Sequence, residues 1–304
     1  MPALPHQEWT ARREAHFAKA QLHTAPTRKR LSRGEPHPVY DFLVRYYRLS
    51  LGRLETWQPS WEMTLALPPD EPSPFPEKHY RVDGETLSLN PYVLSEKEQK
   101  RLKHIAHLLR CTQSRPANFA CHGLHEWAMV YRGAEIRHRE TVPLRLSQNE
   151  INALVESRPL CCTHFDAFRF FSPEAQPLNK TQPDLWSREE NEQPGCIHAN
   201  MDLYKWAYKS MPWVGSDLLW ECFLFALKAR EIDMRASPYD LSSYEYNAIP
   251  VETPEGRKEY EEEQRALTET AKPLRQELIE SLDNLLRTLQ NIPADDSAAA
   301  TTHS

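Results

Sequence analysis

The sequence predicts an α+β fold that is mainly α-helical, with a few short strands, in one globular domain. Apolar residues recur at helical spacing over most of the 304 residues, whereas the alternating patterns typical of strands are short. Hydrophobic residues make up 40% and charged residues 26%, enough for a sizeable core. No internal repeat is present. We expect a basic N-terminal helix and connector over 1–36, the main domain over 37–292 and a disordered tail over 293–304.

The N-terminal part carries helical patterns separated by polar segments. Residues 5–20 form an amphipathic pattern that predicts a helix, and a polar, basic connector follows as far as Pro38. A second helix is expected over 39–47, because proline suits the first turn of a helix. Five prolines within 66–78 predict a surface loop.

The middle of the chain carries the clearest local signals. Asp-Gly at the centre of 82–85 predicts a hairpin, because this pair tolerates the positive φ of tight turns. Ser-x-x-Glu capping boxes predict helices over 95–109 and 147–155. The aromatic residues within 163–171 predict a short strand.

The C-terminal half is expected to be helical after a long loop over 173–194, which has no periodic pattern. Apolar periodicity predicts helices over 200–210 and 216–234. A long, highly charged helix is expected over 255–291, with an interruption at Pro273.

Composition excludes some classes of function. The chain has 8 Gly against 25 Pro, and it contains neither the dinucleotide-binding motif nor the P-loop motif. Nucleotide-dependent folds of these types are therefore not expected. The six cysteines form no CxxC pair, and no apolar run approaches 18 residues. We therefore expect reduced thiols, a cytoplasmic location and no membrane contact.

Charge is unevenly distributed. The net charge is -6, yet basic residues outnumber acidic ones across the first sixty residues. Such a basic arm is able to bind the phosphates of DNA, and the alternative is an ordinary solvated surface. The sequence makes no prediction about the oligomeric state.

Two clusters of polar residues in 121–171 are candidates for chemistry. If a helix begins at Cys121, His122 and His125 lie at i,i+3 on one face, and Glu126 joins His122 at i,i+4. On a strand over 163–171, His164, Asp166 and Phe168 would point to the same side. Either set is interpreted as functional or as a hydrogen-bonded structural group.

Two further clusters lie nearer the C-terminus. Asn200 is a candidate helix cap, which would place Asp202 in the first turn, where the helix dipole favours an anion. His198 precedes this cap, in a position from which loops deliver functional groups. Arg235 at a helix exit is able to clamp a phosphate or to pair with a surface acid.

Histidine and carboxylate side chains are concentrated in this central segment. Two or three His with a carboxylate suit Fe, Mn or Zn, so a metal-dependent oxidoreductase or hydrolase is one hypothesis. Its candidate metal ligands are His122, His125, His164, His198 and Asp202.

Four segments resemble a family of bacterial proteins whose members are commonly named 3-methyladenine DNA glycosylase. They are GEPHPVYDFLVRYY at 34–47, HGLHEWAMVY at 122–131, THFDAFRFF at 163–171 and EQPGCIHANMDLYKW at 192–206. The resemblance extends over about residues 8–275. The chain departs from other alkylpurine glycosylases, since it has neither a Gly-rich hairpin followed by an Asp nor a helical repeat, and no catalytic residue is transferred from them.

The resemblance implies a DNA-repair enzyme that hydrolyses the N-glycosidic bond of alkylated purines without a cofactor. Such an enzyme flips the base, stacks it on aromatic rings and stabilises an oxocarbenium-like sugar with a carboxylate. The candidate catalytic residues are Asp166, His164 and Glu126. The candidate substrate-binding residues are Trp127, Phe168, Tyr204, Trp206 and Arg235.

Overall fold

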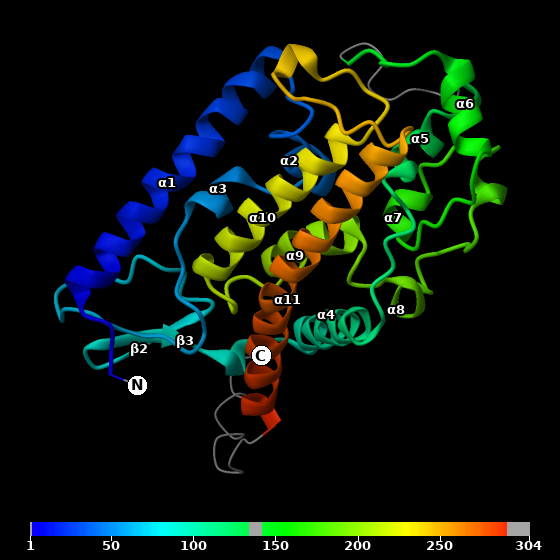
Figure 1. Ribbon diagram of the computed structural model, residues 1–304. Coiled ribbons are helices and arrows are strands. Elements are labelled where there is room, and N and C mark those ends of the chain that lie inside the picture. Colours follow the sequence, from blue (N-terminus) through cyan, green and yellow to red (C-terminus); the bar gives the residue numbers. More distant parts are fainter. Residues whose placement is uncertain (1, 134–141, 291–304) are drawn as a thin grey trace.

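The computed structural model describes residues 2–133 and 142–290, and it confirms a mainly helical α+β fold in one compact body (Figure 1). The strands are β1 (Thr64–Ala66), β2 (Tyr80–Asp83) and β3 (Thr86–Leu89). The α-helices are α1 (His6–Arg33), α2 (Phe42–Tyr47), α3 (Leu51–Glu55), α4 (Glu96–Ser114), α5 (Leu124–Met129), α6 (Gln148–Glu156), α7 (Phe165–Phe168), α8 (Arg188–Asn191), α9 (Ile197–Lys209), α10 (Ser216–Arg235) and α11 (Pro254–Gln290). The tail predicted over 293–304 lies outside the described residues.

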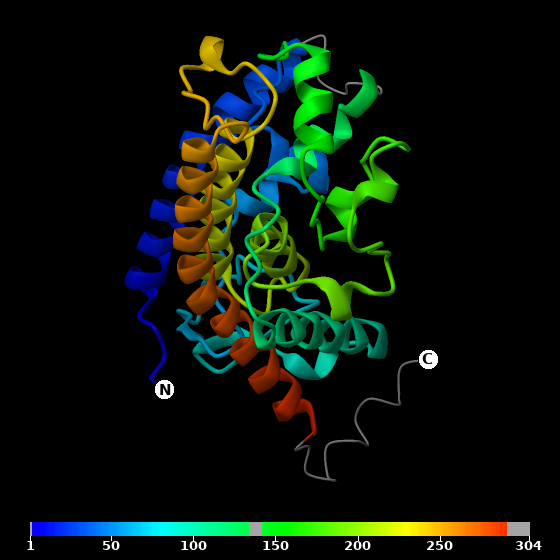
Figure 2. The same ribbon diagram turned by 45° about the vertical axis from the view of Figure 1, so that its right-hand side comes forward.

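Three helices, α9, α10 and α11, pack against one another at the centre of the molecule (Figures 1 and 2). Helix α1 covers the outer side of α10, where His16 contacts Trp220 and His23 contacts Phe223. Helix α9 is enclosed on all sides, with 12 of its 13 residues buried. Because this buried helix carries charged and polar side chains, those groups require partners in the interior.

The small sheet lies at one end of the helical body and confirms the predicted hairpin (Figure 1). Its strand order is β1-β3-β2, and both pairs are antiparallel. Gly84 takes a φ of 58° between β2 and β3, as the Asp-Gly turn requires. The Trp9 indole donates a hydrogen bond of 2.8 Å to the carbonyl of Ala66, which ties α1 to the sheet.

Both predicted capping boxes are confirmed. The Ser95 hydroxyl accepts from the Glu98 amide, and the Glu98 carboxylate accepts from the Ser95 amide at 3.0 Å. Ser147 and Glu150 exchange the same pair of bonds at the start of α6. Helix α4 continues past residue 109 to Ser114.

Helix α1 is longer than predicted, because the expected connector is also helical and continues through Pro26. A proline inside a helix costs about 3 kcal/mol. Tertiary contacts of the second half offset this cost: Arg28 pairs with Glu55, and Arg30 pairs with Asp41 at 2.5 Å. The following helix begins at Phe42 rather than directly after Pro38.

Helix α11 likewise runs without interruption through Pro273, contrary to prediction. Residues on both sides of the proline are buried, among them Ala271, Leu274 and Leu278. Packing against α4, α9 and α10 therefore holds the helix continuous along its length.

The strand predicted over 163–171 is wrong. His164 is extended, and Phe165–Phe168 forms the short helix α7, in which the Phe168 amide donates to the His164 carbonyl at 3.0 Å. Phe168 and Phe171 pack into the helical core rather than onto a sheet, and within the described residues the segment pairs with no named strand. His164, Asp166 and Phe168 consequently do not share a strand face.

Candidate active site

Helix α9 supplies the centre of the candidate site, and it begins earlier than predicted. Its N-cap is Cys196 rather than Asn200. The side-chain nitrogen of Asn200 instead donates to the Pro194 carbonyl at 2.9 Å, and its side-chain oxygen accepts a hydrogen bond from Arg275. Asp202 therefore lies beyond the first turn, so its position is explained by its charged partners rather than by helix capping.

One group of buried charges surrounds Arg230 of α10, and we call it the Arg230 cluster. Arg230 Nη1 donates to Glu126 at 2.8 Å and to Asp233 at 2.7 Å. His125 Nε2 lies 2.7 Å from the other oxygen of Asp233. These four side chains are almost fully buried, and each has an opposite charge or a hydrogen-bonding partner.

A continuous chain of contacts runs through this cluster from a thiol to a carboxylate. Cys121 Sγ lies 3.3 Å from His125 Nδ1, and the chain continues through Asp233 and Arg230 to Glu126. Burial by itself would lower the pKa of His125, but Asp233 and, after it, Cys121 together outweigh burial and raise this pKa well above the usual value. Burial would raise the pKa of Asp233, but His125 outweighs it and lowers that pKa. The pair is therefore an imidazolium and a carboxylate.

His198 of α9 has a different electrostatic character. Its ring packs edge-on against His125, with centroids 4.5 Å apart, and is stacked with His164 at 5.5 Å. Burial and the neighbouring His125 cation lower the pKa of His198 well below its usual value. His198 is therefore a neutral imidazole, able to accept a proton.

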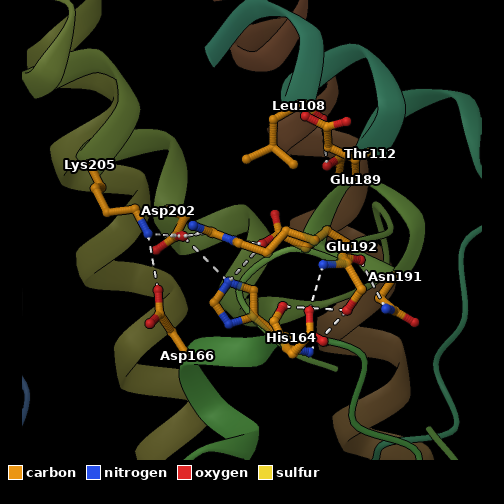
Figure 3. Close-up of polar contacts among 12 residues, drawn as sticks. Leu108, Thr112, His164, Asp166, Glu189, Asn191, Glu192, Asp202 and Lys205 are labelled. Atoms are coloured by element: carbon orange, nitrogen blue, oxygen red, sulfur yellow. Dashed lines mark hydrogen bonds and ion pairs between the residues drawn. The ribbon is translucent and has the colours of Figure 1, made fainter. Parts of the chain in front are cut away.

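A second group of buried charges surrounds Asp202, and we call it the Asp202 cluster (Figure 3). Arg188 Nη2 donates to Asp202 at 3.1 Å, and Lys205 also bonds to this carboxylate. His164 Nε2 lies 3.3 Å from Asp202 and 3.6 Å from Glu192, which accepts from Arg188 at 2.6 Å. Burial would raise the pKa of Asp202, but these cations outweigh it and lower the pKa well below its usual value.

Lys205 connects the Asp202 cluster to Asp166. Figure 3 shows its ammonium group between the two carboxylates, and it lies 3.3 Å from Asp166. Arg169 lies 3.2 Å from the other oxygen of Asp166. Asp166 is the more accessible acid, since its side chain is 22% exposed against 1% for Asp202.

A cavity of about 260 Å³ opens beside these charges. Glu126, Arg230, His198 and Asp166 line it from four different helices. The other lining residues are mainly apolar or aromatic, and they include Phe42, Tyr46, Met129, Val130, Phe170 and Tyr239. Arg45 and His37 also line the cavity. A concave, largely apolar site with a few convergent polar groups is typical of small-molecule and cofactor pockets.

The cavity brings together some of the residues predicted as catalytic or metal-binding. Glu126, Asp166 and His198 line it directly. His125 and His164 lie behind His198, within the two clusters. His122 stands apart, because α5 begins only at Leu124 and the expected His122–His125 pair on one helix face does not form.

The residues predicted to bind substrate lie elsewhere. Trp127, Phe168 and Tyr204 are core residues, and the Trp127 indole donates to the Ala236 carbonyl at 2.9 Å. Trp206 is covered by cationic side chains, including Lys205 at 4.4 Å from the ring centroid. Arg235 donates to the Asn247 carbonyl and lies 3.5 Å from Glu259, as a surface-pairing residue does.

Several site residues were not recognised in the sequence as part of a site. Arg230 is the most important, and its place on the apolar face of α10, four residues after Ala226 and four before Met234, was an available signal. Phe42 and Tyr46 fall in the first of the four resembling segments and stack at 4.9 Å. The loop predicted over 173–194 is wrong in part, because Arg188 begins the short helix α8, and Arg188 itself gave no local signal.

Two groups of side chains place possible metal ligands within 4.8 Å of one another: His125, His198 and Asp233, and His164, Glu192 and Asp202. In the first group both ring nitrogens of His125 already have partners. In the second, Asp202 bonds two cationic side chains. Since a ligating imidazole must be neutral with a free nitrogen, these contacts favour ion-pair networks over metal centres.

None of the helices in the described part of the chain has the length and apolar composition of a membrane-spanning segment. No family model, curated protein or solved structure matches the chain. The chemistry of the site is therefore inferred from the residues that form it.

Proposed function

We propose that the cavity is the active site of a hydrolase that cleaves the N-glycosidic bond of alkylated purines, with 3-methyladenine in DNA as the expected substrate. The observation that carries the proposal is the composition of one cavity, in which two carboxylates and a neutral imidazole meet aromatic walls. The resemblance of four segments to proteins named for this reaction gives the proposal its specific substrate.

The aromatic walls suit a planar base. Phe42 and Tyr46 stack with an angle of 11° between their rings, and the ring centroid of Phe170 lies 6.2 Å from that of Tyr46. A purine methylated at N3 carries a positive charge, which aromatic rings attract through their negative faces. Two carboxylates, Glu126 and Asp166, and two guanidinium groups, Arg230 and Arg45, also line the cavity, so their formal charges cancel one another.

Asp166 and His198 suit the two charge changes of the reaction. As the bond from C1′ to the purine nitrogen breaks, its electron pair leaves with the base and neutralises it, while positive charge develops on the sugar. The Asp166 carboxylate, the more exposed of the two acids, is placed to stabilise that charge. His198 accepts a proton from the water that adds to C1′. Arg230 holds Glu126 in place.

Exposed basic residues at the cavity and on α1 suit contacts with the DNA backbone. Arg45 at the cavity and Arg169 beside Asp166 are exposed, as are Arg13, Lys29 and Arg33 of α1. Phosphate contacts of this kind make binding strongly salt-dependent. We also keep the cytoplasm as the proposed location, because all six cysteines are free.

Release of free base tests the proposal. Purified protein, with chelator present, is incubated with DNA methylated at adenine N3, and free 3-methyladenine is measured by chromatography. We expect release by the wild type and a loss of about 10²-fold or more in Asp166→Asn, since one carboxylate at a developing charge contributes that much. Glu174→Gln, a change of an exposed acid away from the cavity, should retain the wild-type rate. No release at stoichiometric protein would refute the proposal.

A metal-dependent enzyme is the second candidate; its basis is the spacing of the two groups of His and carboxylate atoms, which lie within 4.8 Å of one another, whereas their ion pairs count against it. It predicts Fe, Mn or Zn in near-stoichiometric amount in purified protein, and loss of that metal in His198→Ala. Elemental analysis that finds less than about a tenth of an equivalent, together with chelator-resistant activity, would contradict it.

A further inference from the structure

A thiol, an imidazole and a carboxylate follow one another behind the main cavity. Cys121 Sγ is 3.3 Å from His125 Nδ1, and His125 Nε2 is 2.7 Å from Asp233. Nucleophile, base and orienting acid in this order characterise activated cysteines on unrelated folds. The base and the acid are buried, whereas Cys121 is partly exposed.

The contacts of Cys121 distinguish it from the neighbouring thiols. Cys121 Sγ lies beside the ring of His125, whose other nitrogen contacts the buried Asp233 carboxylate, whereas Cys161 Sγ and Cys162 Sγ each lie 3.6 Å from a backbone carbonyl. Burial also raises the pKa of Cys161, Cys162 and Cys196, which favours their thiol form.

All four thiols line one small cavity, which shares His198 as a lining residue with the main cavity. Its volume is about 10 Å³, roughly the space of a single water molecule, and His125 and Tyr260 are among its other lining residues. Peptides, nucleotides and other large electrophiles do not fit this space. Cys121 is also partly exposed, so small solutes reach it from the surface.

The backbone beside Cys121 is held in an uncommon conformation. His122 has a φ of 44° and Gly123 a φ of 72°, and a Cβ atom added at Gly123 would lie 3.2 Å from Ala236 Cβ. A non-glycine residue with positive φ costs about 1–3 kcal/mol, which the surrounding packing must offset. This turn directs the Cys121 side chain toward α5, where His125 is located.

We propose that Cys121 is a modification site for small hydroperoxides, of which hydrogen peroxide is the simplest. The Cys121 sulfur attacks one peroxide oxygen, an S–O bond forms and the O–O bond breaks. The leaving hydroxide takes the proton that Cys121 Sγ and His125 Nδ1 share and departs as water. The products are the sulfenic acid of Cys121, whose hydroxyl proton comes from the peroxide, and a neutral imidazole; sulfur is oxidised by two electrons and the peroxide is reduced.

The wild-type protein contains its own controls. Cys161 and Cys196 share the small cavity but have no imidazolium partner. Cys111 and His107 on α4 form the matched pair at the surface. The Cys111 sulfur lies 3.6 Å from His107 Nε2, but this same nitrogen lies 3.2 Å from Glu189, and His107 and Glu189 are both solvent-exposed. The comparison separates access to peroxide from activation of the thiol.

Native full-length protein is treated with a limiting amount of hydrogen peroxide in the presence of dimedone, and adducts are quantified at each cysteine by mass spectrometry. We expect Cys121 to be trapped at least about tenfold faster than Cys111, Cys161 and Cys196. Equal or faster trapping at any of these three, or no adduct at Cys121, would overturn the proposal.

A variant then tests the role of the imidazole. In folded His125→Gln protein, verified by circular dichroism, trapping at Cys121 should fall to the rate of Cys161. An unchanged rate would also overturn the proposal. If this variant does not fold, the wild-type comparison alone decides, since it requires no substitution. The trapping experiment contains no DNA and measures adducts at the cysteines alone, so its outcome is read separately from base release.

Discussion

The Arg230 cluster and the Asp202 cluster are made of the same kinds of residue but differ in their access to the cavity. In the Arg230 cluster, Glu126 and Arg230 themselves line the cavity, next to the neutral ring of His198. In the Asp202 cluster, the two carboxylates are 1% and 2% exposed, and neither lines the cavity. Buried ion pairs therefore do not mark an active site by themselves; contact with a cavity and a nearby group able to accept a proton do so.

The largest expected effect concerns the stability of the Asp202 cluster. Asp202→Asn leaves Lys205 and Arg188 buried without a full counter-charge, and such a change typically costs about 3–5 kcal/mol of stability. Unfolding in urea measures the loss. Asp283→Asn, which breaks the exposed pair with Arg110, is the control and should cost less than about 1 kcal/mol. Similar losses in both variants would show that the Asp202 cluster is not a stabilising unit.

The Arg230 cluster should be more important for catalysis than for folding. Glu126→Gln keeps the shape of the side chain and leaves Arg230 paired with Asp233. We expect base release to fall about 10²-fold, because a charge at the cavity is lost, with a smaller change in unfolding free energy than in Asp202→Asn. A larger loss of unfolding free energy in Glu126→Gln than in Asp202→Asn, with base release unchanged in Glu126→Gln, would contradict this distinction between the clusters.

The His125 imidazolium of the Arg230 cluster predicts that the stability of the protein depends on pH. Since the pKa of His125 is raised in the folded protein, its contribution to stability is fully present below about pH 6.5 and declines as pH rises toward the folded value. Between pH 7 and 8 this contribution should fall by about 1.4 kcal/mol per pH unit. Folded His125→Gln should lack that part of the slope, whereas His79→Gln should retain it. An unchanged slope in His125→Gln would contradict the charge assignment.

The smallest expected effect lies at the exposed edge of the cavity. Arg45→Ala should weaken DNA binding a few-fold and reduce the slope of log affinity against log salt by about one, with no effect on stability, because Arg45 is exposed. Fluorescence anisotropy at several salt concentrations measures both quantities. An unchanged salt slope would place the DNA backbone elsewhere.

Local signals in the sequence predicted the elements whose structure local chemistry determines. The two capping boxes and the Asp-Gly hairpin formed as expected, since their bonds join residues that are at most nine positions apart. The first helix was predicted to end at residue 20 and the last to be interrupted at Pro273, yet α1 and α11 continue through Pro26 and Pro273. Long-range pairs such as Arg30 with Asp41 offset the cost, and one sequence does not show such partners.

The site was predictable only in part for the same reason. Glu126, Asp166 and His198 were picked from helical spacing, a strand face and a position before a helix cap; none of these local features formed, but the three residues line one cavity. Arg230 pairs with Glu126 across 104 positions in the chain. The aromatic residues proposed to bind substrate, such as Tyr204, are core residues, because residue type does not distinguish a pocket wall from packing.

The chain of contacts from Cys121 to Glu126 has a thermodynamic consequence, because it joins the small cavity to the main one. If modification of the thiol changes the affinity of the main cavity for a ligand by some factor, that ligand must change the equilibrium of the modification by the same factor. The ligand affinity of the main cavity and the modification equilibrium of Cys121 are then linked, so a measurement of either one reports on the other.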